Sequence, residues 1–201
     1  MGSKTTSKPK TNRTKKSKTK SGEDRYEIRL SGSGGQGLIL AGVILSEALG
    51  IGDKKNVVQS QSYGPEARGG ASRADVVVAD GEIYYPKTMK LDMLLALTQE
   101  ACDKYYPDVK EGGILIVDSG MVTQVPTKKY FGLPFTQLAR EEIGIVMVAN
   151  VISLGAIAEF TGIVSKQAIK DAVLARAPKG TEEKNTKALE LGFSAARKLK
   201  R

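Results

Sequence analysis

A glycine-rich stretch, Ser31-Gly-Ser-Gly-Gly-Gln-Gly37, constrains this chain more than any other segment. It follows a short strand-like run at residues 26–30 and precedes apolar residues at helical spacing over 38–49. This order predicts a strand, a tight turn and a helix. Glycines in such a turn let the backbone pass close to a ligand or a neighbouring chain. The helix that follows would present unpaired N–H groups, which favour an anion.

The spacing of Gly32, Gly34 and Gly37 matches the G-x-G-x-x-G pattern of dinucleotide sites. Such sites usually place an acidic residue at the end of the second strand, where it binds the ribose. Here residues 57–60 contain no acid, and Asp53 lies before that strand rather than after it. The sequence therefore argues against NAD. Three alternatives remain for the turn: it meets a phosphate-bearing group, it meets the backbone of another subunit, or it only lets helix and strand pack.

The composition of the chain changes sharply near residue 22. Residues 1–22 contain eight Lys or Arg residues and no acid, whereas the whole chain carries a net charge of +9. A segment this polar buries too little surface to offset the entropy of ordering it. We therefore expect a disordered basic tail at 1–22 and a single domain at 23–201. A solubilising extension is preferred over a nucleic-acid-binding arm.

The residue types that are missing exclude several kinds of chemistry. The chain has no histidine and one cysteine, Cys102. It therefore cannot build the common zinc sites, a Ser-His-Asp triad, an internal disulfide or a cysteine-ligated iron–sulfur cluster. The most apolar run, residues 143–158, is too short and too polar to span a membrane, and the first residues lack a signal-peptide core. We expect a cytoplasmic protein that makes and breaks few bonds itself.

Strand-like and helix-like segments alternate along the chain. The expected strands are residues 26–30, 56–59, 74–79, 114–117, 128–132 and 145–147. The expected helices are residues 38–49, 90–99, 134–142, a buried helix that ends at Phe160, 166–176 and a last helix after Thr181. Several strands are continuous Val/Ile runs, which is typical of a mostly parallel sheet with helices on both faces. Ligands of such sheets bind at the carboxyl ends of strands, where we place the glycine turn and the loop at 60–73.

Small residues indicate how two of the helices pack. On the buried helix, close packing against another element is expected at Ala149, Ser153, Gly155 and Ala156. On the last helix, the residues expected to face the core are Ala188, Leu191, Ala195 and Leu199. Ser165 is the expected N-cap of the helix at 166–176.

A second motif, Ser62-Tyr-Gly-Pro-Glu-Ala-Arg-Gly-Gly-Ala-Ser72, lies in the loop at 60–73. Its Gly-Pro and Gly-Gly pairs fix two sharp changes of direction. Arg68 between them suits a carboxylate or a phosphate, and Tyr63 offers an aromatic face and a hydroxyl. An internal Glu66–Arg68 ion pair is the alternative, but an exposed pair contributes at most about 1 kcal/mol. Binding or docking is therefore the favoured interpretation.

These residues resemble the gamma subunit of 2-oxoacid:ferredoxin oxidoreductases. The resemblance rests on Gly34-Gly-Gln-Gly37, on Tyr63-Gly-Pro-Glu-Ala-Arg-Gly-Gly70 and on Tyr85-Pro86, and it spans about residues 26–198. It implies a Rossmann-like fold. It also implies a complex that decarboxylates a 2-oxoacid, transfers the acyl group to coenzyme A and passes electrons to ferredoxin. Thiamine diphosphate, Mg²⁺ and [4Fe-4S] clusters would belong to the alpha, beta and ferredoxin-like delta subunits, so this chain alone would bind none of them.

The resemblance also ranks the functional alternatives. It favours 2-oxoglutarate as the substrate of the complex, with pyruvate, branched-chain 2-oxoacids and indolepyruvate as alternatives. A stand-alone nucleotide-binding module is the alternative of a different class. The chain is expected to be inactive alone, with no catalytic residue and no metal site. The candidate contacts to coenzyme A or to a neighbouring subunit are Gly34, Gly35, Gln36, Gly37, Tyr63, Glu66 and Arg68.

Overall fold

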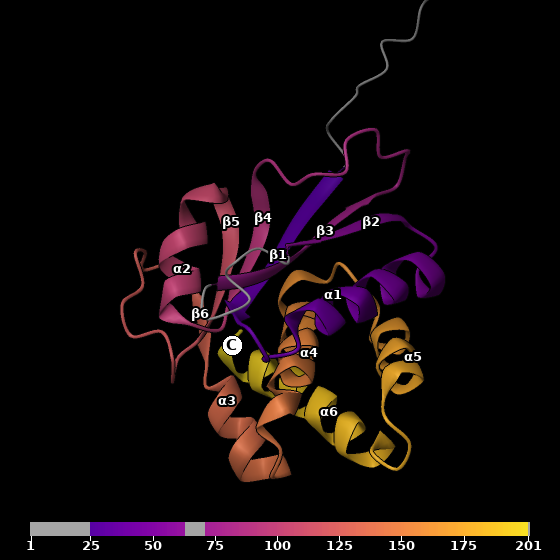
Figure 1. Ribbon diagram of the computed structural model, residues 1–201, viewed down its shortest axis with the longest axis vertical. Coiled ribbons are helices and arrows are strands. Elements are labelled where there is room, and N and C mark those ends of the chain that lie inside the picture. The colour runs from indigo at the N-terminus through magenta and orange to yellow at the C-terminus, as the bar shows by residue number, and fades with distance from the viewer. Residues whose placement is uncertain (1–24, 63–70, 201) are drawn as a thin grey trace, which may run out of the picture.

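The computed structural model describes residues 25–62 and 71–200. Within these residues, a six-stranded sheet with the order β2-β3-β1-β4-β5-β6 carries helices on both faces (Figure 1). The strands are β1 (Arg25–Ser33), β2 (Asn56–Ser62), β3 (Ala71–Ala79), β4 (Leu91–Ala96), β5 (Val109–Asp118) and β6 (Phe131–Leu133). The basic tail expected at 1–22 lies outside the described residues.

The helices divide unequally between the two faces of the sheet. They are α1 (Leu38–Glu47), α2 (Gln99–Tyr105), α3 (Phe135–Leu138), α4 (Ala149–Thr161), α5 (Lys166–Arg176) and α6 (Glu182–Leu199). The first helix and the last three pack against one face, and α2 packs against the other (Figure 1). Short helical turns extend α1 at Ala48–Gly52, α2 at Tyr106–Asp108 and α3 at Ala139–Ile143.

The sheet is mostly parallel, as the sequence predicts. β1 pairs in parallel with β4, β4 with β5, and β5 with β6. β3 is antiparallel to both of its neighbours, β1 and β2. A parallel return needs a crossover of a dozen or more residues, about the length of a helix with its loops. The chain between β2 and β3 comprises only residues 63–70, so β3 runs back beside β2.

Two expected elements are wrong. Residues 90–99, expected as a helix, contain β4 (Leu91–Ala96) and the first residue of α2. A short apolar run suits a buried strand or a buried helix equally well, and pairing with β1 and β5 on both sides decides for the strand. Thr98 then starts α2, because its Oγ1 accepts from the Ala101 N–H at 3.3 Å. Residues 145–147, expected as a strand, lie mostly in a 3₁₀ turn (Val146–Val148) that leads into α4.

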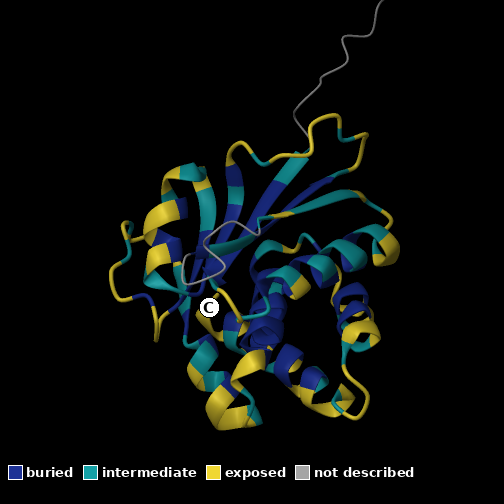
Figure 2. Cartoon of the chain, in the orientation of Figure 1, coloured by how far each residue is buried: buried dark blue, intermediate teal, exposed yellow. Residues whose placement is uncertain are grey.

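Two apolar clusters form the core, one on each face of the sheet. The larger lies among α1, α4, α5, α6 and the sheet, and Figure 2 shows α4 as almost wholly buried. The smaller lies under α2 and contains the single cysteine. Burial raises the pKa of the Cys102 thiol to about 11. This thiol is therefore protonated and unreactive at neutral pH.

The packing of the C-terminal helices agrees only partly with the sequence. Ser165 caps α5 as expected, since its Oγ accepts from the Ala168 N–H at 3.2 Å. The buried face of α6 agrees in part with the expected one, since Leu191 and Ala195 are partly buried against the core. Ala188 is buried and Leu199 is exposed. The remaining core positions of α6 are Asn185, Leu189, Gly192, Phe193 and Ala196.

Candidate functional site at the carboxyl edge of the sheet

The glycine turn closes the carboxyl end of β1. Ser33, the last residue of β1, pairs with Ala71, the first residue of β3. At the end of β2, Ser62 pairs with Arg73. The chain therefore leaves β2 and begins β3 at the edge of the sheet that carries the glycine turn (Figure 1). Tyr63, Glu66 and Arg68 lie outside the described residues, between these two strand ends.

The glycine turn is held by its own glutamine. The Ser33 N–H donates to Gln36 Oε1 at 2.8 Å. Gly35 and Gly37 have φ values of 88° and 70°, in the left-handed region that glycine adopts without strain. A Cβ on Gly32 would lie 2.2 Å from Gln36 Oε1. The Gln36 side chain thus folds over Gly32, and its Oε1 accepts a hydrogen bond from within the turn.

The start of α1 is tied to the buried helix α4. The Gly37 carbonyl accepts from Asn150 Nδ2 at 3.1 Å and from the Ala41 N–H at 2.9 Å. A Cβ on Gly37 would lie 2.4 Å from Asn150 Nδ2. Asn150 was not predicted from the sequence to contact the turn. One signal for such a contact was present, namely a polar residue in an otherwise apolar helix. A buried polar side chain needs a hydrogen-bond partner.

The outer side of the turn is open. Gly34 and Gly35 are exposed, and a Cβ added to Gly35 would meet no atom within 4 Å. Gly37 stands at the N-cap of α1 and offers no side chain to the first-turn N–H groups. These N–H groups and the helix dipole favour an anion or a carbonyl oxygen from a partner. The turn can therefore accept a phosphate or the backbone of another subunit.

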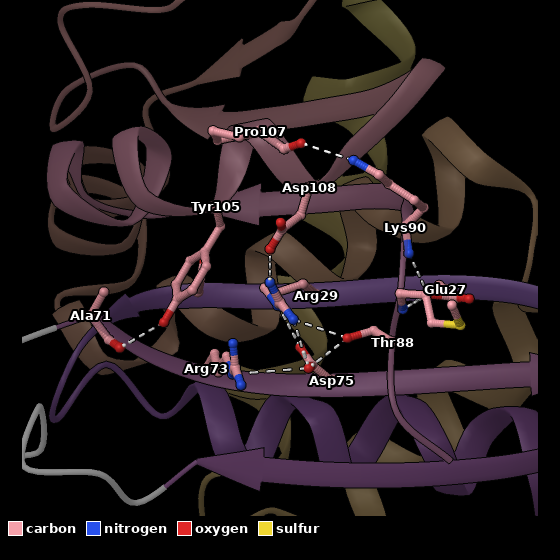
Figure 3. A network of polar contacts seen from close by, with 12 residues as sticks. Glu27, Arg29, Ala71, Arg73, Asp75, Thr88, Lys90, Tyr105, Pro107 and Asp108 are labelled. Carbon is pink, nitrogen blue, oxygen red and sulfur yellow. Dashed lines mark hydrogen bonds and ion pairs between the residues drawn. The ribbon is translucent and has the colours of Figure 1, made fainter. Parts of the chain in front are cut away.

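A buried polar network lies on the face of the sheet that α2 covers in part (Figure 3). Arg29 Nε and Nη2 donate to the two Asp75 oxygens at 2.7 and 2.9 Å, and its Nη1 donates to Asp108 at 2.6 Å. Arg29 Nη2 also donates to Thr88 Oγ1 at 2.9 Å. Burial acts to lower the pKa of Arg29, but the hydrogen bonds and charges of Asp75 and Asp108 outweigh it and raise that pKa. Arg29 therefore stays charged, and its hydrogen bonds hold the fold.

Beside this network is a hollow of about 470 Å³. It extends from Ser60–Ser62 at the end of β2 to Lys87–Met89 before β4, and Arg73 and Asp75 form part of its floor. Arg73 Nε lies 3.9 Å from Asp75 Oδ2, which is beyond hydrogen-bond distance. The Arg73 guanidinium also lies 5.7 Å from the centroid of the Tyr105 ring. The sequence did not single out this hollow, because its residues come from five separate segments.

The structure gives two further findings about the described part of the chain. Among residues 25–62 and 71–200, no group of three or more Cys, Asp or Glu side chains is arranged to hold a metal ion. None of the helices placed in these residues has the length and apolar character needed to cross a membrane.

The sheet order and the glycine turn define an α/β domain with its open turn at the carboxyl edge. Comparison with known proteins then gives the family. Residues 27–195 match the family model described as pyruvate ferredoxin/flavodoxin oxidoreductase. The chain is 51% identical over 180 residues to the 2-oxoglutarate synthase subunit KorC of Methanocaldococcus jannaschii, a match that covers 87% of this chain and 96% of that protein. The chain belongs to the pyruvate ferredoxin/flavodoxin oxidoreductase family.

Solved structures agree with this assignment. The gamma subunit of a keto/oxoacid ferredoxin oxidoreductase from Geobacter sulfurreducens matches with a TM-score of 0.81 at 50% identity, covering 88% of this chain and 98% of that chain. A 2-oxoglutarate:ferredoxin oxidoreductase from Magnetococcus marinus, with 2-oxoglutarate, coenzyme A and succinyl-CoA bound, matches with a TM-score of 0.77 at 21% identity. That match covers 88% of this chain and 32% of the larger one, and it shows a shared fold.

Proposed function

We propose that this chain is the gamma subunit of a 2-oxoglutarate:ferredoxin oxidoreductase. The observation that carries the proposal is the 51% identity to KorC of M. jannaschii over nearly the whole of both chains. Relatives named for other 2-oxoacids are less similar. The common gamma subunit of the pyruvate/ketoisovalerate oxidoreductases of Thermococcus kodakarensis is 30% identical, and the pyruvate synthase subunit PorC of Methanothermobacter thermautotrophicus is 28% identical. Pyruvate and branched-chain 2-oxoacids are therefore secondary alternatives.

The complex oxidises 2-oxoglutarate to succinyl-CoA and CO₂ and reduces ferredoxin. Thiamine diphosphate, Mg²⁺ and the [4Fe-4S] clusters belong to the alpha, beta and ferredoxin-like delta subunits. A sequence without histidine and with one buried cysteine supports this division, because clusters need several thiolates. Residues 23–201 act as one domain without a catalytic residue, and residues 1–22 are an added basic tail.

The role of this chain is to supply a rim beside the alpha and beta subunits that covers coenzyme A. The rim comprises Gly34–Gly37 and the segment that contains Tyr63, Glu66 and Arg68. The open backbone at Gly34 and Gly35 and the N–H groups at the start of α1 support a contact with a phosphate. Gln36 acts by holding the turn through Ser33. The sequence assigns Arg68 to a phosphate or carboxylate on the same partner.

Reconstitution tests the proposed function. We expect 2-oxoglutarate-dependent ferredoxin reduction, with coenzyme A consumed, when the full chain is mixed with purified alpha, beta and delta subunits. Omitting the chain should reduce that rate strongly, and the chain alone should show no turnover. Pyruvate should be the poorer substrate. A chain that stays separate from those subunits and retains a nucleotide would instead be a stand-alone nucleotide-binding module.

Two glycines allow a matched test of the rim. Gly35 and Gly144 have φ values of 88° and 79°, and neither would bring a Cβ within 4 Å of another atom. Alanine at either position costs about 1–2 kcal/mol of backbone strain. In the reconstituted complex, Gly35→Ala is expected to raise the KM for coenzyme A several-fold or to weaken assembly. Gly144→Ala should change neither, and Arg68→Ala should act like Gly35→Ala. If the two glycine variants had equal KM values and assembled equally well, Gly35 would not be part of the rim.

A further inference from the structure

The strand at one edge of the sheet has no neighbour on its outer side. β2 pairs with β3 over its whole length, from Asn56 to Ser62, in an unbroken antiparallel register. Among the described residues, no strand pairs with the other side of β2 (Figure 1). An edge strand presents unpaired N–H and C=O groups, which another strand can satisfy. The open side of β2 is therefore a surface to which a further strand can be added.

The sequence of β2 carries none of the features that usually protect an edge strand. Such strands are kept from pairing by charged side chains, proline, a bulge or short length. β2 is seven residues long, Asn-Val-Val-Gln-Ser-Gln-Ser, and contains no charged residue, proline or glycine. The opposite edge differs, because β6 has only three residues and the pairing of β5 with β4 is irregular between Leu91 and Met93. This contrast favours a β2 that is paired rather than left open.

A hollow of about 490 Å³ lies between β2 and α1. Its lining includes Ile51, which is 69% exposed. Ser46 Oγ and Gln59 Nε2, in the same lining, are shielded from water and have no hydrogen-bond partner in the described part of the chain. Buried polar atoms normally have such a partner. The single chain thus leaves both apolar surface and polar atoms of this hollow unsatisfied.

Charge at this edge of the sheet is balanced within the chain. The lining of the hollow contains one acid, Glu47, and one base, Lys55. Glu47 accepts from Arg176 Nε at 2.9 Å, and Lys55 Nζ donates to the Ile163 carbonyl at 3.3 Å. β2 itself is uncharged. A strongly acidic or basic partner therefore gains nothing here, whereas a second copy of the chain meets an equally neutral strand.

We propose that β2 pairs with the β2 strand of a second copy of this chain, antiparallel to it and about a two-fold axis that passes through Gln59. The two six-stranded sheets then join into one continuous sheet. Two-fold dimers are by far the commonest homo-oligomers. With the axis at the middle residue, all seven residues of each strand are paired, and Val58 faces Ser60 of the second copy. The inference does not depend on the proposed function, because it concerns the chain alone.

Self-pairing also suits the residue at the axis and the charges beside the strand. Gln59 would lie opposite Gln59 of the second copy, with their Cβ atoms about 5 Å apart. A glutamine amide has both donors and an acceptor, so each side chain can donate to the other once its amide turns toward the axis. A second copy always supplies this match, whereas an unrelated strand would need an amide at that one position. Antiparallel pairing also keeps Lys54 and Lys55 of the two copies about 25 Å apart along the strands, beyond the Debye length of about 8 Å.

The mass of the full chain in solution tests the proposal. Sedimentation over a dilution series is expected to show a species of twice the 21.5 kDa chain mass, which dissociates on dilution. Val58→Lys/Ser60→Lys would place like charges opposite each other across the axis, so we expect its dimer dissociation constant to rise at least about ten-fold. Val58→Lys/Ser60→Glu would place opposite charges there and should recover most of that loss at low salt. The control Ser194→Lys/Leu199→Lys adds two charges at exposed positions of α6 and should dimerise as the wild type does.

Each other outcome overturns the proposal. A wild type that stays monomeric at every concentration excludes the dimer and leaves the proposed function standing. A dimer that Val58→Lys/Ser60→Lys does not weaken uses another surface. If both β2 variants stay folded in thermal unfolding but dissociate equally, the strands do not pair antiparallel about Gln59. If the change at Val58 unfolds the chain, Asn56→Lys/Ser62→Lys and Asn56→Lys/Ser62→Glu, whose positions face each other in the same register, are compared in the same way.

Discussion

Replacing Gly192 with alanine is expected to lower the free energy of unfolding by about 3 kcal/mol, at the upper end of the usual cost of overpacking. Helix propensity alone predicts the opposite sign, because alanine favours a helix interior by about 1 kcal/mol over glycine. The close crossing of α4 and α6 decides which of these two opposite effects is larger. A Cβ on Gly192 would lie 2.0 Å from the Ile152 carbonyl oxygen and 3.1 Å from the Ala156 nitrogen. These are backbone atoms, so relief requires the two helices to separate.

The test is urea unfolding of the full chain. The change in the free energy of unfolding is read from the shift of the transition midpoint, provided that the slope m is the same in both proteins. Gly155→Ala is expected to behave similarly, since its Cβ would lie 2.3 Å from the Leu189 carbonyl oxygen on α6. Gly81→Ala is the control, because a Cβ there meets no atom within 4 Å and the backbone is not left-handed. A Gly192→Ala midpoint equal to that of Gly81→Ala would mean that the helices do not cross this closely.

The α4–α6 crossing also shows how far the sequence predicts packing. The small residues of α4 indicated a close neighbour, and the contact at Gly155 confirms that expectation. The expected face of α6 was right in part, because Ala188 is buried and Leu191 and Ala195 pack against the core. It wrongly included Leu199, which is exposed, and it left out Gly192. At a close helix crossing the central residue is the smallest one, Gly192, and hydrophobic periodicity gives glycine no weight.

Local geometry explains what the sequence predicted well. The glycine turn needs only the Ser33–Gln36 hydrogen bond between residues three apart and left-handed backbone at Gly35 and Gly37. The strand before it and the helix after it follow from hydrophobic spacing. The bond from Asn150 to Gly37 joins residues 113 positions apart. No short-range pattern encodes such a contact, so the sequence could mark Asn150 as polar but could not name its partner.

Pairing between strands accounts for most of the remaining differences between the expected and the observed elements. The direction of β3 depends on how short the chain at 63–70 is, a length that could be counted from the sequence. Residues 91–96 form a strand (β4) rather than a helix because β1 and β5 pair with them on both sides, and these neighbours lie far away in the chain. The charges at Arg25, Glu27 and Arg29 occupy alternate positions of β1. Their period was visible in the sequence, but their partners in the loop at residues 80–90 were not.

Replacing Arg29 with methionine is expected to lower the free energy of unfolding by about 3–5 kcal/mol, the usual cost of removing one partner from a buried ion pair. Asp75 is buried and would lose both of its hydrogen bonds from the guanidinium, and Thr88 would lose one. Adding Asp75→Asn to Arg29→Met should restore about 1–3 kcal/mol of the free energy of unfolding, because the buried side chain at position 75 is then uncharged. The measurement is a double-mutant cycle by urea unfolding.

The control is Arg197→Met, which breaks an ion pair with Glu159 in which Arg197 is largely exposed, and such pairs contribute about 0–1 kcal/mol. The expected cost comes from a buried Asp75 carboxylate that has lost its cation, and not from the loss of arginine packing. Loss of packing alone would leave the two single changes additive, with no recovery in the double variant. An additive cycle, or an Arg29→Met cost no larger than that of Arg197→Met, would contradict the buried network. A confirmed coupling would also link the loop at residues 80–90 to the stability of the sheet, because Thr88 of that loop bonds to both Arg29 and Asp75.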